Sequence, residues 1–521
     1  MLSEKGFPQA SREAEQGHGH RAGNEHGKGS SHGPHGHDKL GHDKAGHDKS
    51  RHAQQRQGRP GHGHGPFGQA PAAPLRMEDL FASEQGEPLA HAFSKKATIH
   101  PFMNARPIAR EAMAASWERI KEIPRKGKSV AYLHIPFCEN HCLYCGFYQN
   151  PWRTNQSSVY ADAIICELQA HRDSASHSGA PIHAVYFGGG TPTALETKDL
   201  CRIIEAVHEC LPLAPDCEIT IEGRIFSFSL EKAKACFAAG ANRMSLGVQT
   251  FDTRLRRRMG RKVSGEEAQA FLSELLDLDQ GAIIIDLIFG FPSQTEEGWA
   301  EDVAKAAALG LDGVDLYALN LLPSSPLAMS IEKGKMPPAP DQSAMGRFYQ
   351  IGSEVLSRHG WQSISTSHWR RATRERNLYN LLVKSGASCL AFGAGAGGNL
   401  ANISFRLNGD LQGYMESVAR GEKPLGFMMQ TPERFNFLNE TKAQMEVGLL
   451  HVEALCERLG ALRLDTAADI LPLLKQWQRA GLLELADGWG RLTIAGRFWQ
   501  VTMTQYLIQW VQQRLEAAAA Q

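Results

Sequence analysis

The feature that most constrains the fold is a regular alternation of apolar and helix-like segments that begins near residue 129. Six short segments rich in β-branched and aromatic residues predict β-strands at 130–135, 183–187, 217–222, 243–248, 282–287 and 313–319. Between them lie segments of helical composition, including 158–172, 197–211, 229–240 and 295–309. Six β-α units in series predict an α/β fold with a parallel sheet and helices on its outer face, as an open doubly wound sheet or a partial barrel.

The chemically informative motifs all follow, or lie late in, these predicted strands. "HIPFCENHCLYCGFY" (134–148) overlaps the end of the first strand, and "GGGTP" (188–192) follows the second. Glu222 ends the third strand, Gln249 follows the fourth, and Asp286 lies late in the fifth. In parallel barrels the chemistry lies at the carboxyl ends of the strands. We therefore expect these residues to share one rim.

Three cysteines at the spacing C-x3-C-x2-C, namely Cys138, Cys142 and Cys145, indicate a metal centre. A [4Fe-4S] cluster held by three thiolates keeps one iron without a protein ligand, and that iron can bind a small molecule. The alternative is a zinc site with His141 or His134 as fourth ligand, although zinc modules usually bring two separated ligand pairs. The downstream motifs favour the cluster. The other seven of the ten cysteines are interpreted as thiols in a reducing compartment.

The stretch "YLHIPFCENHCLYCGF" resembles the signature of radical S-adenosylmethionine (SAM) enzymes, in the branch of oxygen-independent coproporphyrinogen III oxidase. The resemblance covers roughly residues 129–430. It implies a partial (β/α)6 radical SAM barrel whose open iron chelates the amino and carboxylate groups of SAM. It further implies that an electron from the cluster cleaves SAM to a 5′-deoxyadenosyl radical, so that the cofactor carries the hard chemistry.

The same resemblance implies residues for two SAM molecules. Backbone at Gly188, Gly189 and Gly190 would approach the first SAM, Thr191 would lie near its amino group, and Glu222 would accept hydrogen bonds. Tyr132 and Tyr144 would pack against it. The alternatives are an ordinary tight turn for the glycines, a solvent-side carboxylate for Glu222 and plain core positions for the tyrosines. A second SAM is implied at Gln249, Arg261, Asp286 and Ala318.

Departures from the oxidase pattern indicate a subfamily. They are "EGRIFSF" with Arg224, "FGAGAGG" (392–398) with Gly397, and "SHWRRATRERNLYN" (367–380). Together they are most similar to the anaerobic haem-degrading methyltransferases of the ChuW/HutW type, the anaerobilin synthases. That resemblance implies methyl transfer to haem, opening of the porphyrin ring to a linear tetrapyrrole and release of iron without oxygen, as in iron acquisition. The oxidase itself and a non-enzymatic haem chaperone of the same branch are the alternatives.

A haem substrate needs aromatic faces and guanidinium groups that pair with its propionates. Trp369 and the arginines Arg370, Arg371, Arg374 and Arg376 are candidates, with a solvated charged face that includes Glu375 as the alternative. His368 is a candidate haem ligand or a hydrogen-bonded structural residue. No catalytic residue is assigned from the sequence.

Composition divides the chain into four parts. Residues 1–70 contain half of the 22 histidines, few large apolar groups and the repeat "GHDKL GHDKA GHDKS", which predicts a disordered tail. His37, His42 and His47 could bind metal or haem iron, or act only as a solubilising extension. Residues 71–128 are interpreted as an N-terminal arm and 129–430 as the radical SAM core with a substrate-binding extension. Residues 431–521 resemble a winged-helix-like α+β domain with a hairpin at Asp487–Gly488, which we interpret as a lid over the substrate.

Charge and hydropathy limit the partners. The formal net charge is zero, which argues against nucleic acid or an anionic membrane as the main partner. No stretch reaches the roughly 18 apolar residues of a membrane span, and the N-terminus has no apolar signal segment. A cytoplasmic monomer is expected. The resemblance implies haem as substrate and an electron donor such as flavodoxin or ferredoxin.

Overall fold

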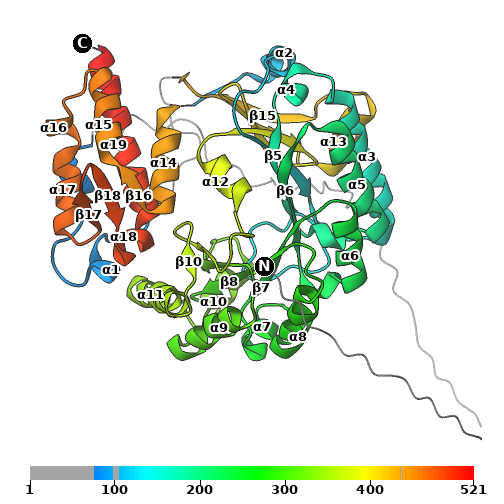
Figure 1. Ribbon diagram of the computed structural model, residues 1–521, viewed down its shortest axis with the longest axis horizontal. Helices are drawn as coiled ribbons and strands as arrows, with labels where there is room; N and C mark the ends of the chain where they lie inside the picture. The colour runs from blue at the N-terminus through cyan, green and yellow to red at the C-terminus, as the bar shows by residue number, and fades with distance from the viewer. Residues whose placement is uncertain (1–74, 98–104, 434–435, 521) are drawn as a thin grey trace, which may run out of the picture. The chain divides into compact units, whose positions relative to one another are not determined.

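All six predicted strands are present in the computed structural model, which describes residues 75–97, 105–433 and 436–520 (Figure 1). They are β2 (Ser129–Ile135), β5 (Ile182–Gly189), β6 (Leu213–Gly223), β7 (Arg243–Gln249), β8 (Ala282–Phe289) and β9 (Gly313–Ala318). Each is parallel to the next and they follow one another in chain order. The prediction of a parallel sheet built from successive β-α units is confirmed.

The sheet is larger than the six predicted strands. A further parallel strand, β12 (Ser388–Phe392), pairs with β2. Beyond it lie antiparallel strands β13 (Gly397–Leu400), β14 (Ile403–Leu407), β15 (Leu425–Gln430) and β1 (Arg106–Pro107). At the other edge, β11 (His368–Arg370) and β10 (Gln362–Ser363) continue antiparallel from β9. The thirteen-stranded sheet ends at β1 and β10, so the barrel is partial and open.

Helices cover the outer side of the sheet, as Figure 1 shows. They are α3 (Ser157–His171), α5 (Thr197–Cys210), α6 (Leu230–Ala238), α8 (Gly265–Leu276), α9 (Glu296–Ala308) and α11 (Gln342–Arg358). Several begin at a polar cap: Ser264 and Glu267 form a capping box at α8, and Thr295 accepts from the Gly298 N–H at α9. These caps fix the first turns of α8 and α9.

Alternation along each strand separates an apolar outer face from a polar inner face. Leu133, Phe187, Leu246 and Ile285 belong to the main hydrophobic core. The residues of opposite parity include Tyr132, Tyr186, Glu222, Arg243, Asp286 and Asp315. Successive side chains of a strand point to opposite faces, so these polar groups all face the barrel interior. The polar lumen is therefore a direct consequence of strand register.

The C-terminal elements form a second, smaller sheet. Its order is β16 (Leu449–His451), β18 (Trp489–Leu492), β17 (Leu483–Ala486), and all pairs are antiparallel. The predicted hairpin is confirmed: Ala486 pairs with Trp489, with Asp487 at φ 50° and Gly488 at φ 78°. Helices α14 (Phe437–Val447), α15 (Val452–Ala461), α17 (Leu471–Arg479) and α19 (Gln500–Ala520) complete this α+β unit.

Part of the N-terminal arm packs on this C-terminal unit. Trp477 Nε1 donates to the Leu80 carbonyl at 3.1 Å, and Gln476 exchanges two hydrogen bonds with the backbone of Ala82 at 2.9 and 2.6 Å. The predicted tail, with His37, His42 and His47, lies outside the described residues. Among the helices that are described, none is both long and apolar enough to cross a lipid bilayer.

Candidate active site

The cysteine loop between β2 and α3 is held by backbone contacts. Cys138 and Cys142 are buried, Cys145 is half-buried, and all three are free thiols. The Cys145 N–H donates to the Cys142 carbonyl at 3.1 Å, and the Leu143 N–H donates to the Met259 carbonyl at 3.2 Å. The loop therefore rests on the segment that follows β7.

Cations and a hydroxyl surround the cysteine sulfurs. Arg224 Nη2 lies 3.2 Å and Arg261 Nη1 3.7 Å from Cys142 Sγ, and Thr191 Oγ1 lies 3.4 Å from Cys138 Sγ. Burial raises the pKa of the Cys138 thiol, while the Thr191 hydroxyl and the Arg224 charge lower it. Two guanidinium groups therefore contact the sulfur of one cysteine, Cys142.

The glycine loop after β5 packs directly on the cysteine loop. A Cβ at Gly190 would lie 2.5 Å from the Phe137 carbonyl oxygen, and one at Gly189, where φ is +114°, would lie 2.6 Å from the His134 ring. The Thr191 hydroxyl donates to the Gly190 carbonyl at 2.8 Å. These glycines are therefore needed for the approach of two loops, whatever ligand their backbone also contacts.

The barrel interior below this rim is acidic and aromatic. Glu222 accepts from the Tyr186 hydroxyl at 2.7 Å and from the Gly189 N–H at 3.3 Å, and its burial raises its pKa. Burial, followed by the charges of Asp315 and Glu222, raises the pKa of Asp286 to about 8. Tyr132 stacks on Tyr186 at 6.4 Å between ring centroids. Tyr132 thus faces the lumen rather than the cysteine loop.

The residues expected around a second SAM line the ends of β7, β8 and β9. Gln249 has φ +74°, and within the described part of the chain its Oε1 is buried without a partner. Arg261 is buried and its Nη2 donates to the Gly247 carbonyl. Ala318 is exposed at the end of β9. Tyr144, which is expected near the first SAM, packs edge-on against Phe291 with 5.2 Å between ring centroids.

Comparison with known proteins agrees with this geometry. The Radical SAM superfamily model matches residues 132–306. Anaerobilin synthase from Escherichia coli O157:H7 is 44% identical over 422 residues, which cover 81% of this chain and 93% of that protein. The chain belongs to the anaerobilin synthase family of radical SAM enzymes.

Two more distant relatives match most of this chain. A haem chaperone from Bacillus subtilis (strain 168) is 27% identical over 371 residues, covering 70% of this chain and 96% of the chaperone. The solved structure of coproporphyrinogen III oxidase from Escherichia coli superposes with a TM-score of 0.66 at 23% identity, covering 79% of this chain and 96% of the oxidase. The latter likeness establishes the partial-barrel fold.

Radical SAM enzymes use a [4Fe-4S] cluster and SAM, and the residues present fit the cluster. No three His, Cys, Asp or Glu side chains of the described residues are gathered closely enough for one metal ion. A cluster distributes its three thiolates over different irons and needs a wider spacing. His141 Nε2 contacts the Cys145 carbonyl at 3.3 Å and its ring stacks on Tyr148, while His134 Nδ1 contacts the Tyr132 hydroxyl at 2.9 Å. These contacts argue against the zinc alternative.

Sequence reasoning missed a buried ionic network in this radical SAM barrel. Arg243 donates to both Glu375 oxygens at 2.9 and 3.0 Å, and His368 contacts Asp315 at 2.7 Å and Glu375 at 3.1 Å. Although burial opposes the charge, Asp315 and Glu375 raise the pKa of His368 to about 9. Both imidazole nitrogens face carboxylates in the interior, which favours the structural interpretation of His368 over the haem-ligand hypothesis. The alternation of side chains along β7 and β9 could have placed Arg243 and Asp315 on the inner face of the sheet. It could not have identified their partners Glu375 and His368.

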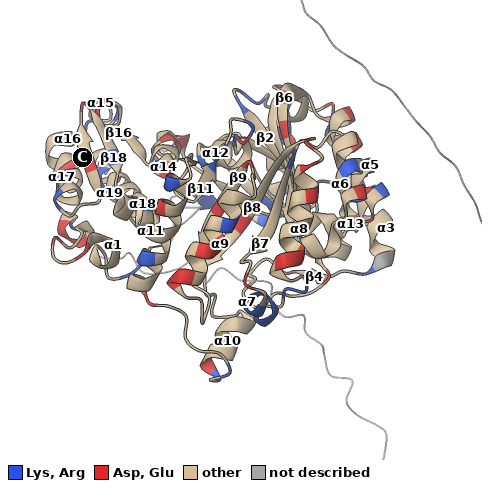
Figure 2. Ribbon diagram, turned by 60° about the horizontal axis from the view of Figure 1, so that its bottom comes forward, with Lys and Arg blue, Asp and Glu red and all other residues tan. Residues whose placement is uncertain are grey.

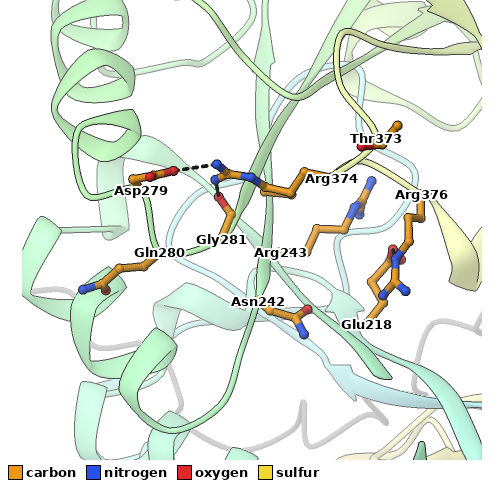
Figure 3. Close-up of a pocket in the computed structure, with 10 residues that line it drawn as sticks. Glu218, Asn242, Arg243, Asp279, Gln280, Gly281, Thr373, Arg374 and Arg376 are labelled. Carbon is orange, nitrogen blue, oxygen red and sulfur yellow. Dashed lines mark hydrogen bonds and ion pairs between the residues drawn. The ribbon is translucent and has the colours of Figure 1, made fainter. Parts of the chain in front are cut away.

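The arginines expected at haem propionates lie at the opposite rim. Arg371 donates to the carbonyls of Gly310 and Leu311, Arg374 pairs with Asp279 at 2.5 Å, and Arg376 pairs with Asp216 at 2.9 Å. Trp369 is buried. Figure 3 shows Arg374 and Arg376 beside a hollow of about 400 Å³ that includes Asn242 and Gly281, at the amino ends of β7 and β8. Arg370 Nη2 contacts Gln362 Oε1 at 3.3 Å. These partners favour the alternative of a structural charged face over the propionate site.

Proposed function

We propose that this enzyme is a radical SAM C-methyltransferase that methylates haem and opens the porphyrin ring to a linear tetrapyrrole, releasing iron without oxygen. The observation that carries the proposal is the 44% identity to anaerobilin synthase over 93% of that protein's length. The barrel rim supports it, because the three cysteines, the glycine loop, Glu222 and Gln249 come from the carboxyl ends of parallel strands or the loops after them.

Each group of rim residues has a defined task in this proposal. Cys138, Cys142 and Cys145 would hold the cluster, which supplies the electron for reductive cleavage of SAM when it is bound. Arg224 and Arg261 contact the Cys142 sulfur and would flank the cluster on that side. Gly189, Gly190, Thr191 and Glu222 would orient the first SAM, with Tyr132 and Tyr144 packed around it.

A second SAM is proposed at Gln249, Arg261, Asp286 and Ala318. The unpartnered Gln249 Oε1 supports this site, because buried polar atoms usually have a hydrogen-bond partner. Changing Arg261 or Asp286 to Ala should spare iron content but reduce methyl transfer by on the order of a hundredfold, as expected when a bound reactant is misplaced by about 1 Å. Unchanged product formation in both variants would contradict a second SAM site and indicate a mechanism with a single bound SAM.

The remaining assignments are part of the same proposal. Haem would occupy the polar and aromatic lumen beneath the rim, residues 431–521 would form a separate domain that acts as its lid, and residues 71–128 would form the arm. An acidic flavodoxin or ferredoxin would supply electrons to a cytoplasmic monomer. The tail at residues 1–70 is proposed to assist capture of haem or metal.

The deciding experiment is anaerobic incubation of the reconstituted protein with SAM, dithionite and haem, followed by mass spectrometry. We expect haem-dependent consumption of SAM, a methylated linear tetrapyrrole and iron released to a chelator. Haem recovered intact without SAM consumption would instead indicate a haem chaperone, which the 27% identical relative keeps as the second candidate. Decarboxylation of coproporphyrinogen III would indicate the oxidase.

A further inference from the structure

A strongly basic segment adjoins the cysteine loop in a chain whose net charge is zero. Residues 254–262 read "RLRRRMGRK", with six cations and no acid. The segment comprises most of α7 (Thr253–Arg258) and the turn after it. Figure 2 shows α7 as a blue element at the surface of the barrel.

The six cations fall into two groups. Arg256 is buried and donates to the carbonyls of Val248 and Thr250 at 2.7 and 2.8 Å, and Arg261 faces Cys142. Arg254, Arg257 and Lys262 are exposed, whereas Arg258 is half-buried and reaches Ser293 Oγ at 3.3 Å. Arg254 and Arg257 are three residues apart and so share one face of α7.

The exposed cations are not held in ion pairs. Across residues 75–97, 105–433 and 436–520, Arg254, Arg257 and Lys262 form no ion pair with a carboxylate. The nearest acids along the chain accept hydrogen bonds from other groups: Asp252 from the Leu255 N–H at 2.8 Å, Glu266 from the Thr253 hydroxyl at 2.8 Å, and Glu267 from the Ser264 N–H at 2.7 Å. The hydrogen bonds from Ser264 lower the pKa of Glu267 most, and of the three exposed cations Arg257 helps to lower it.

The same segment forms part of the support of the cysteine loop. The Met259 carbonyl accepts from the Leu143 N–H, and the Gly260 carbonyl accepts from Asn140 Nδ2 at 2.8 Å. A Cβ at Gly260 would lie only 3.6 Å from Cys142 Cα. Beside it, Lys262 Nζ lies 4.1 Å from the centre of the Phe226 ring, which is 45% exposed. The segment that carries the exposed cations is therefore in contact, through Met259 and Gly260, with the loop that would hold the cluster.

We propose that Arg254, Arg257 and Lys262 form the docking surface for an acidic protein that donates single electrons, such as a flavodoxin. The inference rests on the proposed function, because reductive cleavage of SAM requires an electron. In each encounter the donor would lose one electron and the cluster would gain it, with no bond formed or broken. Complementary charge accelerates such encounters, and electron-transfer partners typically form small, transient interfaces. The exposed cations of residues 254–262 would supply the complementary charge, and they occupy a small surface next to the cysteine loop.

The test uses the full-length holoenzyme and reduced flavodoxin as the probe. In the variant Arg254→Gln/Arg257→Gln, and separately in Lys262→Gln, we expect the apparent KM for flavodoxin to rise about tenfold at low salt and its salt dependence to weaken. Flavodoxin affinity measured by calorimetry should fall by a similar factor. The matched control Arg110→Gln/Arg119→Gln removes two exposed cations from α2 (Arg110–Lys121) and should leave both quantities unchanged.

Dithionite separates this proposal from the proposed function. Because dithionite is a small molecule that needs no docking surface, both variants should cleave SAM at the wild-type rate with it. Unchanged KM and affinity for flavodoxin in both variants would overturn the docking surface. An effect on single-stranded RNA binding without one on flavodoxin would also overturn it and reassign the segment. Failure of wild-type protein to modify haem with dithionite would instead refute the proposed function.

Discussion

Both ends of the parallel strands carry arginines, but the partners of those arginines differ. At the amino ends, Arg371, Arg374 and Arg376 donate to backbone carbonyls and carboxylates. At the carboxyl ends, Arg224 and Arg261 face the sulfur of Cys142. Within the described residues, Arg224 Nε and Gln249 Oε1 are buried there without partners.

This contrast distinguishes a structural rim from a ligand-binding rim. Buried polar groups are normally paired, so unpaired ones mark places where a ligand or water completes the bonding. At the amino-end rim the cations bind backbone carbonyls and carboxylates of the turns between strands and helices. The many cations of residues 370–376 suggested a substrate site. Composition alone does not distinguish a structural rim from a ligand-binding rim.

The largest expected effect is on cluster binding. Cys142→Ser should lose nearly all iron and all SAM cleavage, because a hydroxyl is a poor ligand for iron–sulfur chemistry. Iron analysis, the visible charge-transfer band and SAM turnover measure this. Cys166→Ser changes an exposed cysteine outside the loop and is the control that should retain the cluster. A fully active Cys142→Ser enzyme would contradict the radical SAM interpretation.

The next effect contrasts two glycines. Gly190→Ala places a Cβ 2.5 Å from the Phe137 carbonyl and should displace the glycine loop, with a fall in iron content and a loss of activity of more than about tenfold. At Gly397 the nearest atom to an added Cβ is 3.9 Å away, so Gly397→Ala should retain both. Equal behaviour of the two variants would show that the loop contact is not required.

A smaller effect concerns the pH dependence of stability. Asp286 is ionised above about pH 4 in the unfolded chain, but its pKa is about 8 in the folded protein. Folding therefore favours the protonated carboxyl, and this group makes the free energy of unfolding fall as pH rises from about 4 to about 8. Asp286→Asn should flatten that decline by up to about 1.4 kcal/mol per pH unit.

Denaturant unfolding across that pH range measures the slope. Asp173→Asn, which changes a carboxylate whose side chain is 92% exposed, is the matched control. An unchanged slope in Asp286→Asn would mean that the lumen stabilises the ionised form of Asp286 after all.

The smallest effect is expected at the amino-end rim. Arg374→Gln and Arg376→Gln remove partly exposed ion pairs, which typically contribute about 0–1 kcal/mol. Stability should change by no more than about that amount, and haem turnover should remain near the wild-type rate. A large rise in the KM for haem in either variant would indicate that this rim binds the haem propionates.

Local sequence determined the strands, their order and the rim on which the motifs lie. Short apolar runs rich in β-branched residues, such as "AIIIDL", favour buried strands, and serial β-α units place the carboxyl ends of those strands at one edge. The parity of Glu222 and Asp286 within their strands likewise follows from the two-residue repeat of a strand. These features depend on neighbours in sequence, and the structure confirms the strands.

Only the tertiary structure decided the roles of residues 367–376. His368 and Glu375 are far in sequence from Asp315 and Arg243, and they meet because β11 pairs antiparallel with β9 beside the lumen. The same pairing carries Arg371 and Arg374 to the amino-end rim. Whether a cation binds a ligand or a backbone carbonyl depends on the groups that folding brings within about 3 Å of it, and contacts over such separations leave no local pattern in the sequence.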